Sequence, residues 1–374
     1  MKEIEKEILK FWKENKIFEK LREKLRKSKK RFSFIDGPIT ANNPMGVHHA
    51  WGRTYKDLFQ RFKAMQGYNQ RFQNGFDCQG LWIEVEVEKE KGFKSKKDIE
   101  AFGIARFVEA CKERTERMAQ LITEQSIRLG QWMAWDESYY THSFKANDYK
   151  WFFIKYCHKK GWVYKGVDVI PWCPRCEAAE SKHGLATEGY REKEDKAIYV
   201  KFPVKGKREY FLVWTTTPWT LPANTSIAVN PEIFYVYAKK DDEIFILAEN
   251  LAENVLGKHT IIKKVLGRDL EGIEYEMPYS HLDPQKASIV AGSSLDKEEK
   301  VKAPHKVILW EEVSKEEGTG IVHIAPGCGP EDYQLGKKYK LPAISPLNEQ
   351  GCYVEGFDWL TGKYAFEANE EIIK

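Results

Sequence analysis

Long apolar runs are absent from this sequence of 374 residues. No stretch approaches the roughly 20 consecutive apolar residues that a membrane-spanning helix needs. The first residues, MKEIEKEILKFWKENK, mix both signs of charge and lack the apolar core of a signal peptide. With 42% hydrophobic and 31% charged residues, the composition is that of a soluble globular protein with room for two or three domains. We therefore expect a cytoplasmic protein with no membrane contact.

Cysteine is scarce, and its seven copies are scattered, which argues against a disulfide framework. Only Cys173 and Cys176, in PWCPRCEAAES, form a close pair, and two thiolates at this spacing can share a tetrahedral Zn²⁺. A closed site needs two more ligands; His183 could supply one, but the chain has no second CxxC. We predict half of a zinc knuckle whose other half lies elsewhere, with a redox-active CxxC as the rival. The other cysteines are interpreted as ordinary thiols: Cys78, Cys111, Cys157, Cys328 and Cys352.

Charge of one sign is not in large excess, since the net charge is only +4. Residues 1–31, however, contain 13 Lys or Arg against 6 Glu, so this segment carries +7 and the remainder about −3. Apolar residues recur in it at helical spacing, from Ile4 to Leu25. A basic amphipathic helix over residues 1–30 can contact a nucleic acid backbone. A solvated helix with a lysine-rich outer face explains the same pattern.

Residues 31–84 combine strand, turn and helix signals. The apolar run RFSFI ends in DGP, which predicts a strand that meets a turn. His48 and His49 follow, where apolar residues begin to recur over residues 51–65 at three- and four-residue steps, as on one face of a helix. A second stretch with apolar residues ends in GFDCQG. These features favour a nucleotide or small-molecule site. The alternative is that the two histidines only cap the helix or lie on the surface without a function.

Helix and strand signals alternate over residues 31–170, which predicts half of a parallel α/β sheet. Beyond them, short β-type runs such as AIYVKFPV, REYFLVW and IFYVYAKK are typical of a mostly β barrel or sandwich. No internal repeat or low-complexity segment is visible. We divide the chain into a basic helix (residues 1–30), an α/β domain (31–170), a CxxC segment with its linker (171–190) and a β domain (191–374).

Two motifs in the β region carry hydroxyl, imidazole and carboxylate groups. The run WTTTPWTLPANT fits a strand end, but its tryptophans and prolines favour a rigid pocket wall whose threonine hydroxyls bind a ribose or an ester oxygen. In GTGIVHIAPGCGPEDY, His323 lies in an apolar strand before a loop that leads to Asp332. A core histidine and a helix N-terminal charge explain these two residues. Alternatively, the acid captures an amino group or orients water.

Together these stretches resemble the class I aminoacyl-tRNA synthetases, and within that family the isoleucine branch. The resemblance runs from KFWKENKIFEK essentially to the end of the chain. GPITANNPMGVHH is similar to the family's first signature, GFDCQG to its amino-acid-binding turn, and GTGIVHIAPGCGPEDY to its hydrolytic editing site. TTTPWTLPAN points to the isoleucine branch, since valine and leucine relatives usually carry an arginine after two threonines. The resemblance implies the first half of a Rossmann-like, parallel-sheet catalytic domain with an inserted, mostly β-barrel editing domain.

The resemblance also implies roles for individual residues. His49 and His48 would be catalytic in the activation step and, with Gly46, would bind ATP, which acts together with Mg²⁺. Pro38 would line the isoleucine pocket, and Asp77 would pair with the α-ammonium group. Asp332 would be catalytic in editing, where it would hold the α-ammonium of a mischarged residue. The editing site so implied consists of Thr215, Thr216, Thr217, Asn224, His323 and Asp332, and the metal ligands are Cys173 and Cys176.

The chain departs from the family pattern in several places. Most members have His-Ile-Gly-His where this sequence has GVHH at residues 46–49, so His48 and Gly46 have exchanged places and the nucleotide pocket is altered. Gln79 stands in place of a common histidine, and Glu331 in place of a common aspartate. The KMSKS loop, the second half of the catalytic sheet, the anticodon-binding helices and the second CxxC are absent, which predicts an N-terminal piece.

The implied function is ATP-dependent activation of isoleucine and its transfer to tRNA(Ile), with hydrolysis of mischarged valyl-tRNA(Ile), in a monomeric ligase. Without the KMSKS half, we expect this piece alone to lack activation. Two alternatives stay open. One is a free-standing editing hydrolase of misacylated tRNA, and the other is a non-catalytic tRNA-binding module that uses the basic N-terminal segment.

Overall fold

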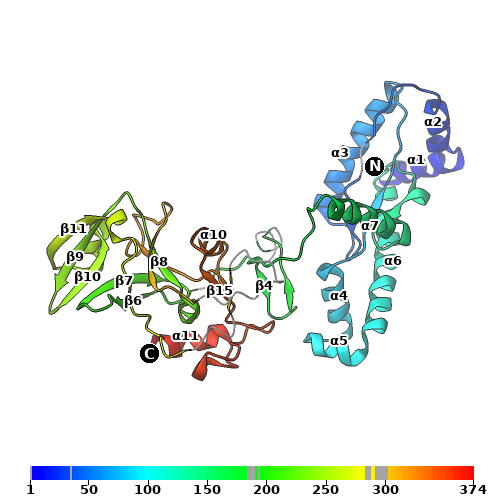
Figure 1. Cartoon of the computed structure of the whole chain (residues 1–374). Helices are drawn as coiled ribbons and strands as arrows, with labels where there is room; N and C mark the ends of the chain where they lie inside the picture. The colour runs from blue at the N-terminus through cyan, green and yellow to red at the C-terminus, as the bar shows by residue number, and fades with distance from the viewer. Residues whose placement is uncertain are drawn as a thin grey trace. The chain divides into compact units, whose positions relative to one another are not determined.

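The structure is a computed structural model, which describes residues 2–33, 36–182, 185, 190–192, 194–282, 288–290 and 302–374. The chain divides into two compact units, unit 1 (Met1–Tyr164) and unit 2 (Lys165–Lys374) (Figure 1). Among the described residues, no helix combines the length and apolar character that a membrane crossing requires.

Unit 1 begins with two helices instead of the single helix expected over residues 1–30. They are α1 (Lys2–Glu14) and α2 (Ile17–Leu25). Lys16 between them has a positive φ of 50°, a left-handed conformation that interrupts the helix. The Trp12 ring then contacts Trp132, with centroids 5.2 Å apart, and the Phe18 ring contacts Phe72 at the same distance. The break thus allows both halves of the apolar stripe to pack on the rest of unit 1.

A three-stranded parallel sheet in the order β1-β2-β3 joins segments of unit 1 that are distant in sequence. Its strands are β1 (Ile39–Thr40), β2 (Gly75–Asp77) and β3 (Tyr139–Tyr140). Of the strand predicted before the DGP turn, Phe34 and Ile35 lie outside the described residues, and β1 follows that turn. The α/β class and the parallel sheet are confirmed.

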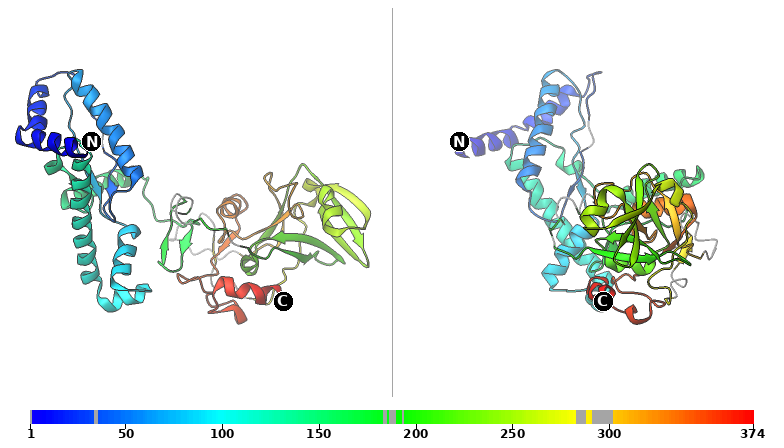
Figure 2. Two further views of the ribbon diagram at one scale, coloured as in Figure 1. Left: turned by 180° about the vertical axis from the view of Figure 1, so that it is seen from behind. Right: turned by 90° about the vertical axis from the view of Figure 1, so that its left-hand side faces the viewer.

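The helices of unit 1 follow the periodicity of the sequence. They are α3 (Val47–Met65), α4 (Leu81–Lys91), α5 (Lys96–Phe102), α6 (Ile104–Arg128) and α7 (Phe144–Lys159). Figure 2 shows α3 and α6 as the long helices of this unit. As predicted, α3 begins at the histidine pair and α7 ends just before Gly161.

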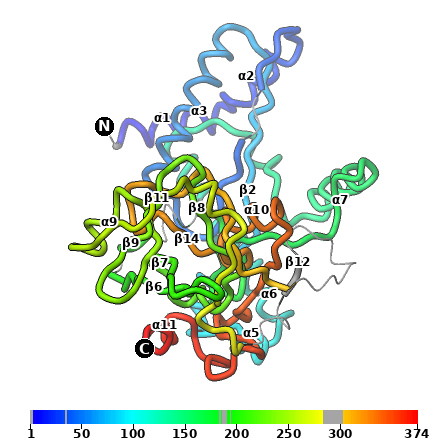
Figure 3. Tube along the Cα trace, turned by 60° about the vertical axis from the view of Figure 1, so that its left-hand side comes forward, coloured from blue at the N-terminus to red at the C-terminus, as the bar shows by residue number. Residues whose placement is uncertain are grey.

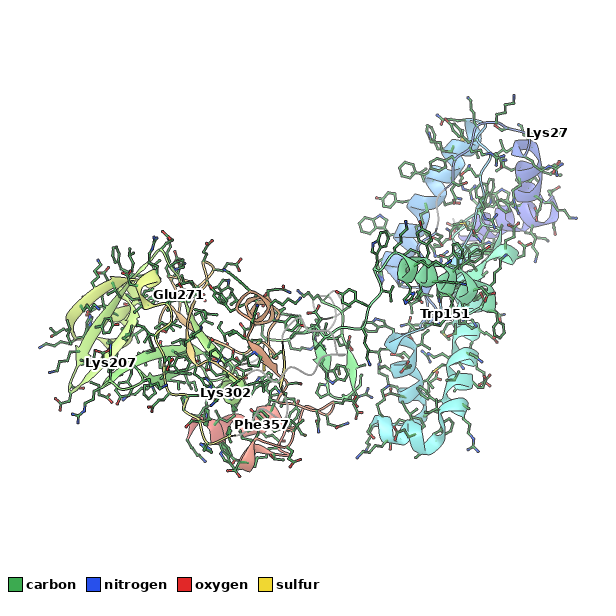
Figure 4. The ribbon with its side chains drawn as sticks, in the orientation of Figure 1. Lys27, Trp151, Lys207, Glu271, Lys302 and Phe357 are labelled. Carbon is green, nitrogen blue, oxygen red and sulfur yellow. The ribbon has the colours of Figure 1, made fainter. Side chains whose placement is uncertain are left out.

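The apolar stripe of α3 is exposed, although the periodicity suggested a packed helix face. Its members are between 51% and 87% exposed: Trp51, Tyr55, Leu58, Phe59, Phe62 and Met65. The buried residues of α3 are Arg53, Gln60 and Ala64. Polar partners explain this choice of face, because the Arg53 guanidinium donates to Asn74 at 3.1 Å and to Gln131 at 3.2 Å. Exposed aromatics also occur on α7, where Trp151 is 68% exposed (Figure 4).

Unit 2 contains a five-stranded sheet in the order β11-β9-β10-β7-β6 and a three-stranded sheet in the order β13-β8-β14. The strands are β6 (Ile198–Pro203), β7 (Glu209–Thr215), β8 (Ser226–Val229), β9 (Phe234–Lys240), β10 (Glu243–Ala248), β11 (Thr260–Leu266), β13 (Lys306–Leu309) and β14 (Ile321–Ile324). The runs AIYVKFPV, REYFLVW and IFYVYAKK form β6, β7 and β9, as predicted. The described residues form open sheets and not the closed barrel that we expected.

Shorter elements complete the described part of unit 2. They are β4 (Trp172–Cys173), β5 (Ala178–Ala179), the 3-10 helices η3 (Pro218–Ala223), η4 (Gly267–Leu270) and η6 (Asp358–Leu360), α9 (Glu249–Leu256), β12 (Ser288–Val290), α10 (Pro330–Tyr339), β15 (Pro342–Ile344) and α11 (Ala365–Ile373). Figure 3 traces the chain through β7, β8 and β14. One apolar core joins η3, η4, η6, α9, β15 and α11 to the sheets, with Phe202, Tyr235 and Phe357 fully buried. Burial of each such side chain contributes about 1.5–3 kcal/mol.

Candidate functional site

The first candidate site lies where β1 and β2 end and α3 begins. Thr40 at the end of β1 pairs with Asp77 at the end of β2. The N–H of Ala41 donates to the carbonyl of Asp77 at 2.9 Å, and the hydroxyl of Thr141 donates to the Asp77 carboxylate at 3.3 Å. The carboxyl ends of parallel strands are the usual place for a ligand in an α/β sheet. Asp77 is therefore held at the edge of the sheet where ligands usually bind.

His49 is bound to the start of α3. Its Nδ1 accepts the N–H of Gly46 at 3.2 Å, so the neutral ring carries its proton on Nε2. Burial, followed by His48 and Arg53, lowers the pKa of His49. His48 is exposed, and the two ring centroids are 3.8 Å apart. The capping interpretation is correct for His49, yet the backbone N–H groups of a helix N-terminus also form an anion site, which fits a nucleotide phosphate.

Pro38 lies in an exposed turn just before β1. The preceding Asp36 is buried, and its carboxylate lies 2.5 Å from the Lys56 ammonium. The Tyr139 hydroxyl donates to the carbonyl of Asp36 at 2.8 Å, so β3 and α3 both hold the turn that carries Pro38. Sequence reasoning missed Asp36, although an acid at the start of DGP was a signal for a buried anchor. Lys56 could not be linked to it without the tertiary structure.

The second candidate site is a row of threonine hydroxyls that ends at a histidine in unit 2. The Thr215 and Thr217 hydroxyls are 3.4 Å apart, and those of Thr217 and Thr220 are also 3.4 Å apart. Oγ1 of Thr220 then lies 2.8 Å from Nε2 of His323. Of these residues, only Thr220 was not predicted; the single threonine after PW carried no signal by itself. The structure joins η3 to β14 through this contact.

His323 is 7% exposed, and burial lowers its pKa to about 4, so the ring is neutral at pH 7. The Thr220 hydroxyl also donates to the carbonyl of Thr217 at 2.8 Å. Because a hydroxyl has one hydrogen, this bond assigns the proton of the 2.8 Å contact to Nε2 of His323. Nδ1 of His323 is then a buried acceptor without a partner among the described residues.

Asp332 lies in the first turn of α10, beside the end of β14. Its Oδ2 accepts the N–H of Ala325 at 3.2 Å, and Ala325 is two residues after His323. Burial raises the pKa of Asp332 to about 6, the Ala325 bond opposes that rise, and the adjacent Glu331 adds to it. A carboxylate that is partly desolvated in this way gains from a cationic partner.

Two other predicted members of the editing site are placed differently. Asn224 is buried, its amide donates to the carbonyl of Ser226 at 2.9 Å, and its oxygen accepts the Tyr275 hydroxyl at 2.5 Å. Its side chain therefore holds the backbone after η3. Thr216 is exposed, and among the described residues no hydrogen bond joins its side chain to the hydroxyl row.

The predicted metal ligands lie on a hairpin formed by β4 and β5. Cys173 is partly buried and Cys176 is buried. Glu180, which the sequence interpretation did not include, follows β5 and lies close to both thiols. His183, named above as a further ligand, lies outside the described residues.

Comparison with known proteins identifies the family of the chain. A family model for class I tRNA synthetases (I, L, M and V) matches residues 7–277, which include the start of α3, the GFDCQG turn and the threonine-rich segment. The chain belongs to the class I tRNA synthetase family. The family model thus spans parts of both units.

Within this class I synthetase family, curated relatives include the isoleucine–tRNA ligases of Methanothermobacter thermautotrophicus and Pyrococcus horikoshii. Each is 43% identical over 99% of the chain, which corresponds to 34% and 35% of the relative. The chain thus spans about a third of the length of the curated relatives that it matches. A crystal structure of a leucyl-tRNA synthetase from Agrobacterium radiobacter K84, in complex with tRNA and LeuAMS, is 15% identical, with a TM-score of 0.38, over 99% of this chain and 46% of that one. A TM-score this low adds nothing to the family assignment.

Proposed function

We propose that the chain carries two working parts of an isoleucine–tRNA ligase: an ATP- and isoleucine-binding edge in unit 1 and a hydrolytic editing site in unit 2. The observation that carries the proposal is made inside a class I synthetase chain. Thr220 contacts His323, and Asp332 accepts the N–H of Ala325, two residues further along the chain from His323. Relatives that match along 99% of the chain are named isoleucine–tRNA ligase, which favours isoleucine as the amino acid.

In the activation step, the isoleucine carboxylate attacks the α-phosphate of ATP, which gives isoleucyl-adenylate and pyrophosphate. The adenylate then esterifies tRNA(Ile). Asp77 would bind the α-ammonium of isoleucine, which orients the carboxylate, and Pro38 would contact the side chain. Because Nδ1 of His49 accepts the Gly46 N–H, Nε2–H is available to donate to a phosphate oxygen. The backbone N–H groups of Val47 and His48, in the first turn of α3, would add to this anion site. Mg²⁺, when bound with ATP, would neutralise phosphate charge.

A second site is required because isoleucine and valine differ by one methylene. In a hydrophobic pocket such a difference is worth only about 1–3 kcal/mol, a limit for which isoleucine against valine is the standard example. Hydrolysis of valyl-tRNA(Ile) at a smaller pocket removes the errors that remain. Unit 2 would supply this pocket.

In the editing step, water attacks the ester carbonyl of valyl-tRNA, and the 3′-terminal ribose leaves with the proton. Asp332 would hold the α-ammonium of the valyl group, since a carboxylate and an ammonium form a strong charge-assisted hydrogen bond. His323 stays neutral and is fixed by Thr220. Its ring would form a rigid wall that admits valine and excludes the longer isoleucine side chain. Thr215, Thr216 and Thr217 would contact the ribose or the ester oxygen.

Two assays of the 374-residue chain test the proposal. We expect it to hydrolyse valyl-tRNA(Ile) and to leave isoleucyl-tRNA(Ile) intact, and we expect the Asp332→Ala variant to lose most of this activity. Equal rates for the two proteins would refute the editing assignment. We expect no ATP–pyrophosphate exchange with isoleucine, because the KMSKS half of the catalytic sheet is not in these residues; robust exchange would contradict that part of the proposal.

A further inference from the structure

Asp332 and Tyr333 are consecutive residues in the first turn of α10, and different parts of unit 2 hold their side chains. Neighbouring residues of a helix are about 100° apart around its axis, so the two side chains leave α10 in different directions. Oδ2 of Asp332 accepts the N–H of Ala325 at 3.2 Å. This distance is at the long end of the usual range, so the bond orients the carboxylate only weakly.

Tyr333 gives the same turn a second and shorter attachment. Its side chain is fully buried, and its hydroxyl donates to the carbonyl of Val167 at 2.5 Å. The ring packs with Ala343 of β15 and with Val169. Because of this attachment, the first turn of α10 cannot rotate about the helix axis without breaking the bond to Val167. The direction of the adjacent Asp332 carboxylate is thus determined from two sides.

The segment that accepts the tyrosine hydrogen bond is itself attached to unit 2. Residues 167–171 have no regular secondary structure and lead into β4. At the start of β4, the indole N–H of Trp172 donates to the carbonyl of Glu349 at 2.8 Å. Between these points, Val169 packs against the tyrosine ring. Val167 is therefore a fixed acceptor and not part of a loose connection.

We propose that Tyr333 is a positioning residue for editing, which holds α10 in the orientation that directs Asp332 to the α-ammonium of the substrate. This inference rests on the proposed role of Asp332 in the hydrolysis of valyl-tRNA(Ile). Tyr333 acts only through Asp332, because its own side chain is buried against β15 and the segment before β4. A charge-assisted hydrogen bond between carboxylate and ammonium depends on alignment, so a small rotation of α10 weakens it.

Tyr333→Phe tests this role, because it keeps the ring and removes only the hydroxyl. Tyr339→Phe is the matched control. Tyr339 lies at the other end of α10, and its hydroxyl also donates to a backbone carbonyl, that of Leu309, at 2.8 Å. Each variant loses one hydrogen bond from a tyrosine to a carbonyl, so urea unfolding should show similar losses of stability. Only Tyr333→Phe should change the editing site.

The measurement is hydrolysis of valyl-tRNA(Ile) by the full 374-residue chain, with KM and kcat determined separately. Full loss of a hydrogen bond to a charged group weakens binding by about ten- to a hundredfold, so misalignment in Tyr333→Phe should raise KM by about three- to tenfold. We expect kcat to stay nearly unchanged, because the ammonium contact is equally present in the ground state and the transition state. Tyr339→Phe should keep the KM of wild type.

A second substrate shows whether Tyr333 acts through Asp332. In this substrate a hydroxyl replaces the α-ammonium of the valyl group, so it carries no positive charge for the carboxylate to bind. Wild type and Tyr333→Phe should therefore hydrolyse it with the same KM. A role of Tyr333 in the stability of α10 alone would affect both substrates equally.

Different results would overturn the inference and the function on which it rests. If Tyr333→Phe has the KM of wild type while Asp332→Ala loses hydrolysis, the tyrosine only fills space and the proposed editing function stands. Equal rises in KM in Tyr333→Phe and Tyr339→Phe, or on both substrates, would assign the effect to a general loosening of α10. Hydrolysis at the wild-type rate by Asp332→Ala would refute the editing role of Asp332 and this inference together.

Discussion

Nε2 of His323 lies 2.8 Å from Oγ1 of Thr220, a contact between residues that are 103 positions apart in the chain. The Thr220 hydroxyl also donates to the carbonyl of Thr217. The group that contacts the histidine ring is therefore itself fixed by a backbone hydrogen bond. A buried imidazole in this arrangement has a defined tautomer and a defined orientation. Such rigidity is what the proposed editing pocket would need to separate two amino acids by size.

Removal of the Thr220 hydroxyl should destabilise unit 2. In Thr220→Val, His323 keeps a buried Nε2–H without its partner, which costs about 1–3 kcal/mol in the free energy of unfolding. Urea unfolding of the full chain measures this loss. Thr260→Val, at an exposed position of β11, is the control and should change stability little. Thr220→Ser keeps the hydroxyl and should recover most of the loss; a Thr220→Val protein as stable as wild type would contradict the assignment.

His323 should make unit 2 less stable in acid. Burial lowers its pKa from 6.5 to about 4, so the folded state favours the neutral ring. The stabilising contribution is therefore complete above pH 6.5 and is lost as the pH falls from 6.5 to about 4, by up to about 3 kcal/mol. The measurement is the free energy of unfolding between pH 7 and pH 4.5 for wild type and for His323→Gln. Substitution of the exposed His281 by Gln is the control. The same pH slope in wild type and His323→Gln would count against the prediction.

Hydrolysis of valyl-tRNA should depend on pH through Asp332. Burial raises the pKa of this carboxyl to about 6, and only its carboxylate can hold the substrate ammonium. As the pH falls through about 6, the carboxylate takes up a proton and KM should rise. Glu331→Gln removes a neighbouring like charge, so it should move the inflection to slightly lower pH and leave the rate at pH 7.5 nearly unchanged. A folded protein whose KM is flat between pH 5 and pH 7 would disprove this role.

Two glycines of the α3 region should respond to alanine in opposite ways. A Cβ at Gly46 would lie 3.0 Å from Cε1 of His48, so Gly46→Ala crowds the histidine pair. Alanine is also a poorer N-cap than glycine, and we expect a loss of about 0.5–1 kcal/mol. Gly52→Ala meets no atom within 4 Å and lies inside the helix, so it should add about 1 kcal/mol. Thermal unfolding of both variants by circular dichroism measures the effect, and shifts of the same sign would be inconsistent with this geometry.

Local sequence patterns and motifs were enough to predict much of the secondary structure and the family. Periodicity correctly predicted α3 and α7, because backbone hydrogen bonds within a helix depend on neighbours in sequence. Alternating and β-branched residues likewise predicted β6, β7 and β9. Four motifs in order were enough to suggest the synthetase family, which the family model confirms.

Only the tertiary structure decided which side chains meet. Periodicity indicates that α3 has an apolar face but not which face is buried, and the buried Arg53 shows that polar partners determined the choice. In the same way, the contact between Thr220 and His323 depends on the packing of η3 against β14. The position of Glu180 beside Cys173 depends on the register of the β4–β5 hairpin. The physical reason is common to all three cases. A contact between distant residues depends on how the backbone segments pair and pack, and no spacing within a single motif contains that information.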